Sequence, residues 1–207
     1  ITRTCPVSGK FTRLQAEIYE IVLRMQRGAI NMIKPGISYR DVHLNACKLM
    51  VEDLRALGLM RGNPSNAVES EAHALFFPHG IGHMMGLDVH EMEDLGDIVG
   101  YMKREKRSGQ FGLNFLRLSR PLEPGFVLTV EPGIYFIPAL INRWLQEGRH
   151  NEFINYSKLD AFHKFGGIRI EDDVLVTPNG SRVLGPEIPK TIQQIEEACA
   201  DQITNYE

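Results

Sequence analysis

Two amphipathic stripes followed by short apolar runs between glycines constrain the fold most strongly. Apolar residues recur every three or four positions from residue 11 to 33 and again from 42 to 57, which predicts two helices that each bury one face. Thr12 followed by Gln15 is a candidate capping box for the first helix, and a Pro-Gly pair at 35–36 ends it. We therefore expect the chain to begin with two long helices against a core.

From about residue 73 the pattern changes to that of strands and turns. Strands are predicted for four apolar or alternating runs: 126–130, 134–137, 168–170 and 174–177. Residues 93–120 are polar and contain a short charged run, which is typical of a solvated loop. Further helices are expected around Trp144 and from 191 to 203. Because no repeat or linker interrupts the chain, we predict one α+β domain with helices gathered around an antiparallel sheet.

Composition excludes several classes of protein. The 207 residues are 43% hydrophobic and 24% charged, with a net charge of −3, so neither disorder nor general nucleic-acid binding is expected. No apolar run approaches the roughly 18 residues of a membrane span. Cys5, Cys47 and Cys199 lie far apart without a C-x-x-C pair, which favours a reducing compartment and predicts a cytoplasmic location.

Three of the seven histidines fall within twelve residues, at His79, His83 and His90. Gly80 and Gly82 argue against a helix here and favour a tight backbone turn. A single histidine in such a segment is more often a plain core or surface residue. The concentration of three favours ligand or catalytic roles.

Two carboxylates stand at the ends of predicted strands. Glu131 closes an apolar strand just before a Pro-Gly turn, and strand alternation places it on the same face as Thr129. Alternation likewise places Glu171 on the same face as Arg169. Taken alone, each is compatible with a surface charge or a weak surface ion pair. Together with the histidines they form the oxygen and nitrogen donor set of Mn, Fe, Co or Zn, and two bridging carboxylates suit a two-metal hydrolytic centre.

Four segments resemble the signature segments of the pita-bread metallopeptidases: HGIGH at 79–83, LDVH at 87–90, TVEPGIY at 129–135 and IRIED at 168–172. That family includes methionine aminopeptidase, aminopeptidase P and prolidase, and the order and spacing of the segments also fit it. FGGIRIE at 165–171 and PKT at 189–191 are most similar to its proline-specific members. The resemblance implies the pita-bread fold, a curved antiparallel sheet with helices packed on its outer face.

The resemblance also implies roles for individual residues. His83, Glu131 and Glu171 would be metal ligands for two divalent ions, with Glu171 bridging both; Mn is expected first, with Co, Zn or Fe as alternatives. Glu131 would also carry the proton between the attacking water and the leaving nitrogen. His90 would donate to the scissile carbonyl oxygen, and His79 would line the pocket and contact substrate.

Two arginines complete the implied site. Arg117 would bind the substrate carboxylate, and Arg120 is a nearby competitor for that role. Arg169 would not bind the metal ions itself but would orient the part of the site around Glu171. The implied substrate is a small peptide with proline at its second position, cleaved before the proline. The full-length protein is expected to be a homodimer.

One departure from the family pattern concerns the ligands. The family has five, of which the first two are aspartates, and the second precedes the segment resembling the β-favouring ITRT at 1–4. We therefore expect residues 1–207 to be the carboxy-terminal part of a catalytic domain, without the upstream strands that carry the aspartates, and inactive by itself. The alternatives are an aminopeptidase P acting on longer peptides, a non-catalytic binding member of the fold, and an amidinohydrolase resembling creatinase. The retained metal-ligand residues argue against the amidinohydrolase, because that reaction needs no metal ions.

Overall fold

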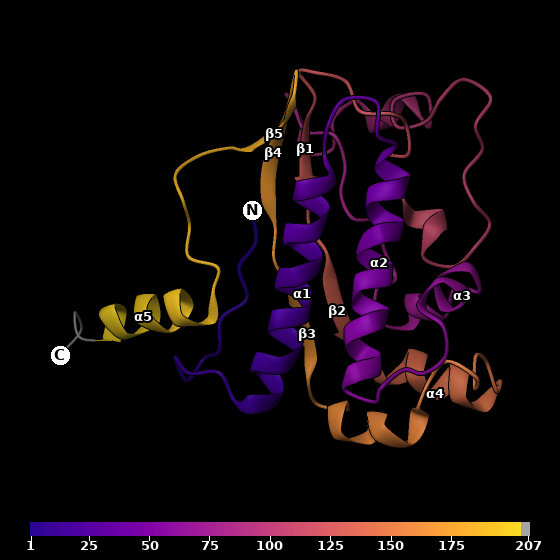
Figure 1. Cartoon of the computed structure of the whole chain (residues 1–207), viewed down its shortest axis with the longest axis vertical. Coiled ribbons are helices and arrows are strands. Elements are labelled where there is room, and N and C mark those ends of the chain that lie inside the picture. The colour runs from indigo at the N-terminus through magenta and orange to yellow at the C-terminus, as the bar shows by residue number, and fades with distance from the viewer. Residues whose placement is uncertain (204–207) are drawn as a thin grey trace.

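The two long helices form one layer of the molecule. The computed structural model describes the backbone of residues 1–203, with α1 at Arg13–Met32 and α2 at Tyr39–Ala56 lying side by side (Figure 1). The capping box is confirmed, because the Gln15 amide donates to the Thr12 hydroxyl at 3.3 Å and the Thr12 amide donates to the Gln15 side chain at 2.9 Å. Both helices confirm the sequence prediction.

Shorter helices surround this layer. They are α3 (Pro64–Glu69), α4 (Pro138–Gln146), α5 (Ile192–Ile203) and the 3-10 helices Ala72–Leu75, Glu93–Leu95, Leu113–Phe115 and Tyr156–Phe162. The helices around Trp144 and near the carboxy terminus confirm the prediction. The sequence analysis missed α3, which the Asn63 side chain begins by accepting from the amides of Ser65 and Asn66.

Five strands follow: β1 (Val127–Val130), β2 (Gly133–Phe136), β3 (Gly166–Arg169), β4 (Asp172–Thr177) and β5 (Gly180–Val183). The first four correspond to the predicted runs. The fifth was missed because it lies at the partly exposed edge of its sheet and carries no apolar alternation. The opening segment makes only an isolated bridge, between Thr2 and Glu171.

A shared register joins the two antiparallel pairs. Val130 of β1 lies opposite Asp172 of β4, and Gly133 of β2 lies opposite Arg169 of β3. If the register of β1 with β4 is continued by one residue, Glu131 lies opposite Glu171, and continuing the register of β2 with β3 by two residues gives the same pair. Opposed residues on antiparallel strands point to the same face, so both carboxylates project from one side of the sheet.

The two faces of these strands differ in character. The face toward α1 and α2 is buried and, apart from Asp172, apolar, with Leu128, Val130, Ile134, Phe136, Ile168, Ile170, Val174 and Val176. The opposite face carries Thr129, Glu131, Tyr135, Arg169, Glu171 and Asp173. Since helices cover the apolar face, the polar face is left for a site, and the prediction of an antiparallel sheet with helices on one face is confirmed.

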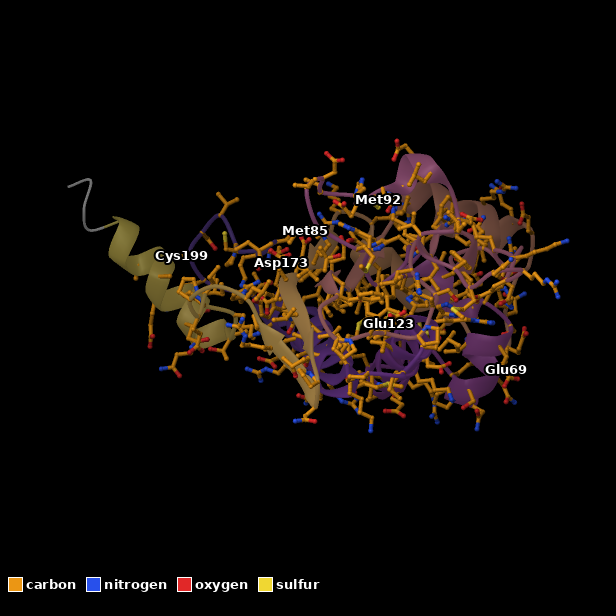
Figure 2. All side chains as sticks on the ribbon, turned by 90° about the horizontal axis from the view of Figure 1, so that it is seen from above. Glu69, Met85, Met92, Glu123, Asp173 and Cys199 are labelled. Carbon is orange, nitrogen blue, oxygen red and sulfur yellow. The ribbon has the colours of Figure 1, made fainter. Side chains whose placement is uncertain are left out.

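The opening segment of the chain and the segment before α5 meet at a buried carboxylate. Asp172 is only 3% exposed and accepts hydrogen bonds from Arg3 at 2.6 Å, Lys190 at 2.7 Å and Gln26 at 2.6 Å. Beyond Lys190, α5 runs along one side of the molecule, and Figure 2 places its Cys199 at the opposite end from Glu69 of α3. Within the described residues, no helix has both the length and the apolar character that crossing a membrane requires.

Candidate metal and catalytic site

The histidine-rich segment runs alongside β1 as an extended neighbour. The amide of Thr129 donates to the carbonyl of His83 at 3.0 Å, and the amide of Glu131 donates to the carbonyl of Ile81 at 2.7 Å. Thus β1 has β4 on one edge and this segment on the other. Backbone pairing thereby fixes the position of His83 relative to Glu131.

The two glycines of this segment allow close approach of backbones. A Cβ on Gly82 would lie 2.0 Å from the carbonyl oxygen of Thr129, and one on Gly80 would lie 2.9 Å from the Cα of Leu116. Neither glycine has a positive φ. The backbone does bend at His79 and Ile81, on either side of Gly80. Glycine is required here for packing against β1 and Leu116, and not for a left-handed backbone conformation.

These elements enclose a cavity of about 310 Å³ on the polar face. Its lining is His79, Gly80, Gly82, His83, His90, Phe115, Arg117, Glu131 and Arg169. Six of the seven residues singled out from sequence are thus brought together. The seventh, Glu171, is not in that lining and lies next to it through its register with Glu131.

His83 and Glu131 form the centre of the cavity. His83 Nε2 lies 3.2 Å from Glu131 Oε1, while His83 Nδ1 donates to the Met84 carbonyl at 2.9 Å. Burial lowers the pKa of His83, but the Glu131 hydrogen bond, the Met84 carbonyl and the Glu131 charge outweigh it and raise that pKa above its usual value. With Nδ1 bound to a carbonyl, Nε2 is the nitrogen free to bind a metal ion in the neutral ring.

Glu131 is held as a carboxylate by several partners. Burial raises its pKa, but the hydrogen bond and charge of His83 and the charges of Arg169 and His79 lower it overall. Arg169 donates to Glu131 Oε2 at 3.2 Å, whereas the sequence analysis assigned it to the Glu171 side. The difference follows from the shared register, which also brings Arg169 within reach of Glu131.

Thr129 is a site residue, although the sequence analysis noted only that its side chain shares a strand face with Glu131. Its hydroxyl accepts from the His83 amide at 3.1 Å and donates to Glu131 Oε1 at 3.2 Å. It therefore links the histidine segment to the carboxylate with a single side chain. Strand alternation, which puts Thr129 on the face of Glu131, was the signal that could have found it.

Tyr135 orients His79 in a similar way. His79 Nδ1 donates to the Gly80 carbonyl at 2.8 Å, so His79 Nε2 accepts from the Tyr135 hydroxyl at 3.0 Å. Burial lowers the pKa of His79, and although the Gly80 carbonyl and the Glu131 charge oppose this, the net shift is downward. His79 is therefore a neutral ring with a fixed tautomer.

His90 and Arg117 form the outer rim. The His90 ring lies 4.5 Å from the His83 ring, nearly perpendicular to it, on an exposed loop. Arg117 lines the cavity and pairs with Glu93 at 2.7 Å. Its competitor Arg120 is absent from this lining and pairs with Glu123 at 2.8 Å.

The donor atoms on this face fit a borderline-to-hard divalent ion. An imidazole nitrogen and a carboxylate oxygen already converge, and Glu171, whose carboxylate accepts from the Thr2 hydroxyl, supplies further oxygens. On the same face, Asp173 Oδ1 is buried and has no hydrogen-bond partner among the described residues. A buried oxygen without a partner beside two carboxylates is the condition that a cation relieves.

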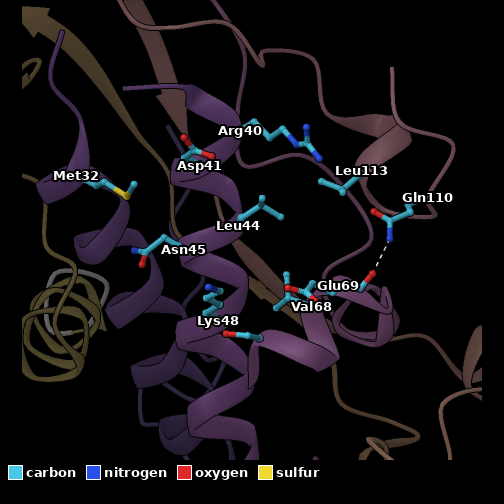
Figure 3. A pocket seen from close by; sticks show the side chains of 11 residues that line it. Met32, Arg40, Asp41, Leu44, Asn45, Lys48, Val68, Glu69, Gln110 and Leu113 are labelled. Atoms are coloured by element: carbon cyan, nitrogen blue, oxygen red, sulfur yellow. Dashed lines mark hydrogen bonds between the residues drawn. The ribbon is translucent and has the colours of Figure 1, made fainter. Parts of the chain in front are cut away.

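A larger hollow of about 440 Å³ lies elsewhere, between α2, α3 and residues 110–113 (Figure 3). Gln110 closes its edge by donating to the Glu69 carbonyl at 2.7 Å. Among the described residues that line it, none belongs to the predicted site. Size therefore does not identify the functional cavity in this chain, whereas the chemistry of the lining does.

Comparison with known proteins agrees with this geometry. Residues 1–178 match the model of metallopeptidase family M24. The chain is 41% identical to a human Xaa-Pro dipeptidase over 200 residues, which are 97% of this chain and 39% of that protein. It is 40% identical over 196 residues to a probable Xaa-Pro aminopeptidase of Fusarium vanettenii, covering 95% of this chain and 40% of the relative.

Solved structures give the same result. The Pseudomonas aeruginosa aminopeptidase PepP superposes with a TM-score of 0.72 at 35% identity, over 99% of this chain and 38% of that one. A Zn-substituted Escherichia coli aminopeptidase P in complex with product gives 0.72 at 34% identity, over 97% and 38%. The chain thus spans about two-fifths of the length of these relatives, and the pita-bread fold expected from the sequence is confirmed. By sequence, fold and site chemistry, the chain belongs to metallopeptidase family M24.

Proposed function

We propose that the protein to which this chain belongs is a two-metal peptidase that hydrolyses the bond before proline, of the Xaa-Pro dipeptidase type. The observation that supports this most is the meeting of His83, Glu131 and Arg169 in one cavity, opposite the Glu171 strand. Relatives at about 40% identity carry the names Xaa-Pro dipeptidase and Xaa-Pro aminopeptidase. A binding protein would have no need of this combination of donors.

His83, Glu131 and Glu171 would hold the ions, and the resemblance assigns the remaining two ligands to aspartates outside this chain. Bound divalent ions would supply Lewis acidity and an activated water near neutral pH. We propose Mn as the metal, with Co, Zn or Fe as alternatives. Glu131, kept ionised by its neighbours, would accept a proton and pass it to the leaving proline nitrogen.

The histidines and Arg117 would handle the substrate. Neutral His79, fixed by Tyr135 and Gly80, would present its ring to the peptide. His90, at the rim beside His83, would donate to the carbonyl oxygen as it gains charge. Arg117, on the cavity wall, would bind the carboxylate of a dipeptide.

A carboxylate partner at Arg117 favours short substrates, because in a dipeptide the carboxylate follows the proline directly. An aminopeptidase P acting on longer peptides is the second candidate, supported by the aminopeptidase names among the relatives. We further propose a homodimer. A cytoplasmic setting is proposed from the cysteines, all three of which are unpaired in the structure.

The test compares substrates of different length. The whole protein, loaded with Mn²⁺, should hydrolyse Xaa-Pro dipeptides with a higher kcat/KM than Xaa-Pro tripeptides or longer peptides. Glu131→Gln should abolish turnover, while the matched control Glu123→Gln, at an exposed surface pair, should leave it unchanged. Preference for longer peptides would favour the aminopeptidase, and no turnover with either would contradict the proposal. The isolated 207-residue chain should be inactive.

A further inference from the structure

A second group of metal-binding side chains lies in the core between α2 and the 3-10 helix Ala72–Leu75. His43 and Cys47 are one helical turn apart on α2, and His73 faces them from the 3-10 helix. All three residues are fully buried, and one ligand atom of each lies within 4.8 Å of the others. Cys47 therefore lies beside two imidazole rings and not only among apolar side chains.

The polar atoms of this group lack good hydrogen bonds. His43 Nδ1 has no hydrogen-bond partner among the described residues, and His43 Nε2 meets only the Cys47 sulfur, at 3.5 Å. The ring nitrogens of His73 make no hydrogen bond of good geometry, although the carbonyls of Ala67 and Val68 lie near that ring. Leaving a buried polar group without a good hydrogen bond is costly, because water no longer solvates it. Poorly satisfied ring nitrogens beside a buried thiol are the condition that a bound ion relieves.

The spacing suits a metal ion. Typical metal–sulfur and metal–nitrogen bonds of about 2.3 and 2.0 Å, at the angles near 120° of a three-coordinate ion, place sulfur and nitrogen ligands roughly 3.7 Å apart. His43 Nε2 and Cys47 Sγ are already close to this separation, at 3.5 Å.

Charge indicates which kind of ion would fit. Burial raises the pKa of Cys47, so the thiol stays protonated unless a cation takes its place. The groups whose charges act on His43 are His73, His79 and Arg40, and none of them is an acid. One thiolate with two neutral imidazoles balances a single positive charge, whereas a divalent ion would leave a net charge buried in the core.

We propose that His43, Cys47 and His73 form a three-coordinate site for a soft monovalent transition-metal ion, Cu⁺, separate from the His83–Glu131 centre. A thiolate with imidazoles selects soft ions, and the carboxylates of the candidate catalytic site select harder ones. The Phe77 ring stands between the two sites, 5.2 Å from the His43 ring and 4.8 Å from the His79 ring. The Phe77 ring would therefore separate the ion from His79 in the lining of the candidate catalytic cavity.

The test is an anaerobic titration of the chain with Cu⁺ in competition with bicinchoninate. A Cys5→Ser/Cys199→Ser background removes the other two thiols, so any thiolate ligand must be Cys47. We expect one equivalent of Cu⁺ with a single sulfur ligand by X-ray absorption. Cys47→Ala in this background should weaken binding more than about 100-fold, beyond the loss typical of an outer partner.

Controls separate this site from the catalytic one and from misfolding. His83→Ala should keep the Cu⁺ equivalent, and His73→Gln should lose it with unchanged far-ultraviolet circular dichroism. The proposal is overturned if the background binds no Cu⁺ against the chelator, or if Cys47→Ala binds as well as the background. It is also overturned if Zn²⁺ occupies the site in preference to Cu⁺.

Discussion

His83 Nε2 lies 3.2 Å from Glu131 Oε1, although the two residues come from segments 48 positions apart. Backbone pairing of the histidine segment with β1 creates this approach, and the hydroxyl of Thr129 bonds to both residues. The proposed metal affinity of this site should therefore depend on Thr129, a residue that is not itself a proposed ligand.

Thr129→Ala should weaken metal binding without removing a ligand. The hydroxyl orients Glu131 and anchors the His83 backbone, and loss of such an outer partner typically costs 10- to 100-fold in metal affinity. Metal analysis of the whole protein after dialysis against a graded chelator measures the change. Thr129→Ser, which keeps the hydroxyl, is the matched control; equal losses in both variants would contradict the hydrogen-bond explanation.

Gly82→Ala should unfold or strongly destabilise the region around β1. Its Cβ would lie 2.0 Å from the Thr129 carbonyl oxygen, a backbone atom held in the strand pairing. Gly109→Ala is the control, since a Cβ there meets nothing within 4 Å and the residue has no positive φ. Thermal melts of both variants decide the matter: a Gly82→Ala protein as stable as Gly109→Ala would show that the approach is not required.

His90→Ala in the whole protein should lower kcat by roughly 100-fold and leave the metal content nearly unchanged. The ring stands beside His83 at the rim, where it can donate to developing charge, and removing such a donor typically has this effect. His163→Ala, at a partly exposed surface histidine, is the control. Loss of an ion from the His90 variant would mean that the residue is a ligand instead.

Periodicity and alternation were sufficient for the local structure of this chain. The three- and four-residue spacing predicted α1 and α2, and the period of two predicted four strands and placed Thr129 and Glu131 on one face. These signals work because burial of one face dictates them directly. The element missed among the strands, β5, is an edge with half-exposed residues, where burial imposes no pattern.

The contacts between distant segments could not be predicted in this way. Nothing local reveals that Gly82 touches the Thr129 carbonyl, that Arg169 pairs with Glu131, or that His73 meets Cys47. Each depends on strand register or helix packing, which a single sequence does not specify. Motif resemblance identified the residues of the cavity, and the three-dimensional arrangement was needed to pair them.

Asp172→Asn should destabilise the fold, because it removes the buried carboxylate with which both Arg3 and Lys190 form ion pairs. Arg3 and Lys190 would be left beside a neutral amide, and breaking a buried pair costs about 3 kcal/mol or more. Urea unfolding at neutral pH measures the loss. Asp160→Asn, at a largely exposed carboxylate, is the control and should change the free energy of unfolding little.

The loss of stability caused by Asp172→Asn should also depend on pH, and it should be smaller at low pH. Burial raises the pKa of Asp172, but the hydrogen bonds and charges of Lys190 and Arg3 outweigh it and bring that pKa below 3.8. Because the folded value is lowered, the stabilisation is complete above the unfolded pKa of about 3.9 and disappears as the pH falls through the folded value. The difference between wild type and Asp172→Asn should therefore stay constant from about pH 8 to 5 and shrink below about pH 4. A difference that grew on acidification would contradict the ion-pair explanation.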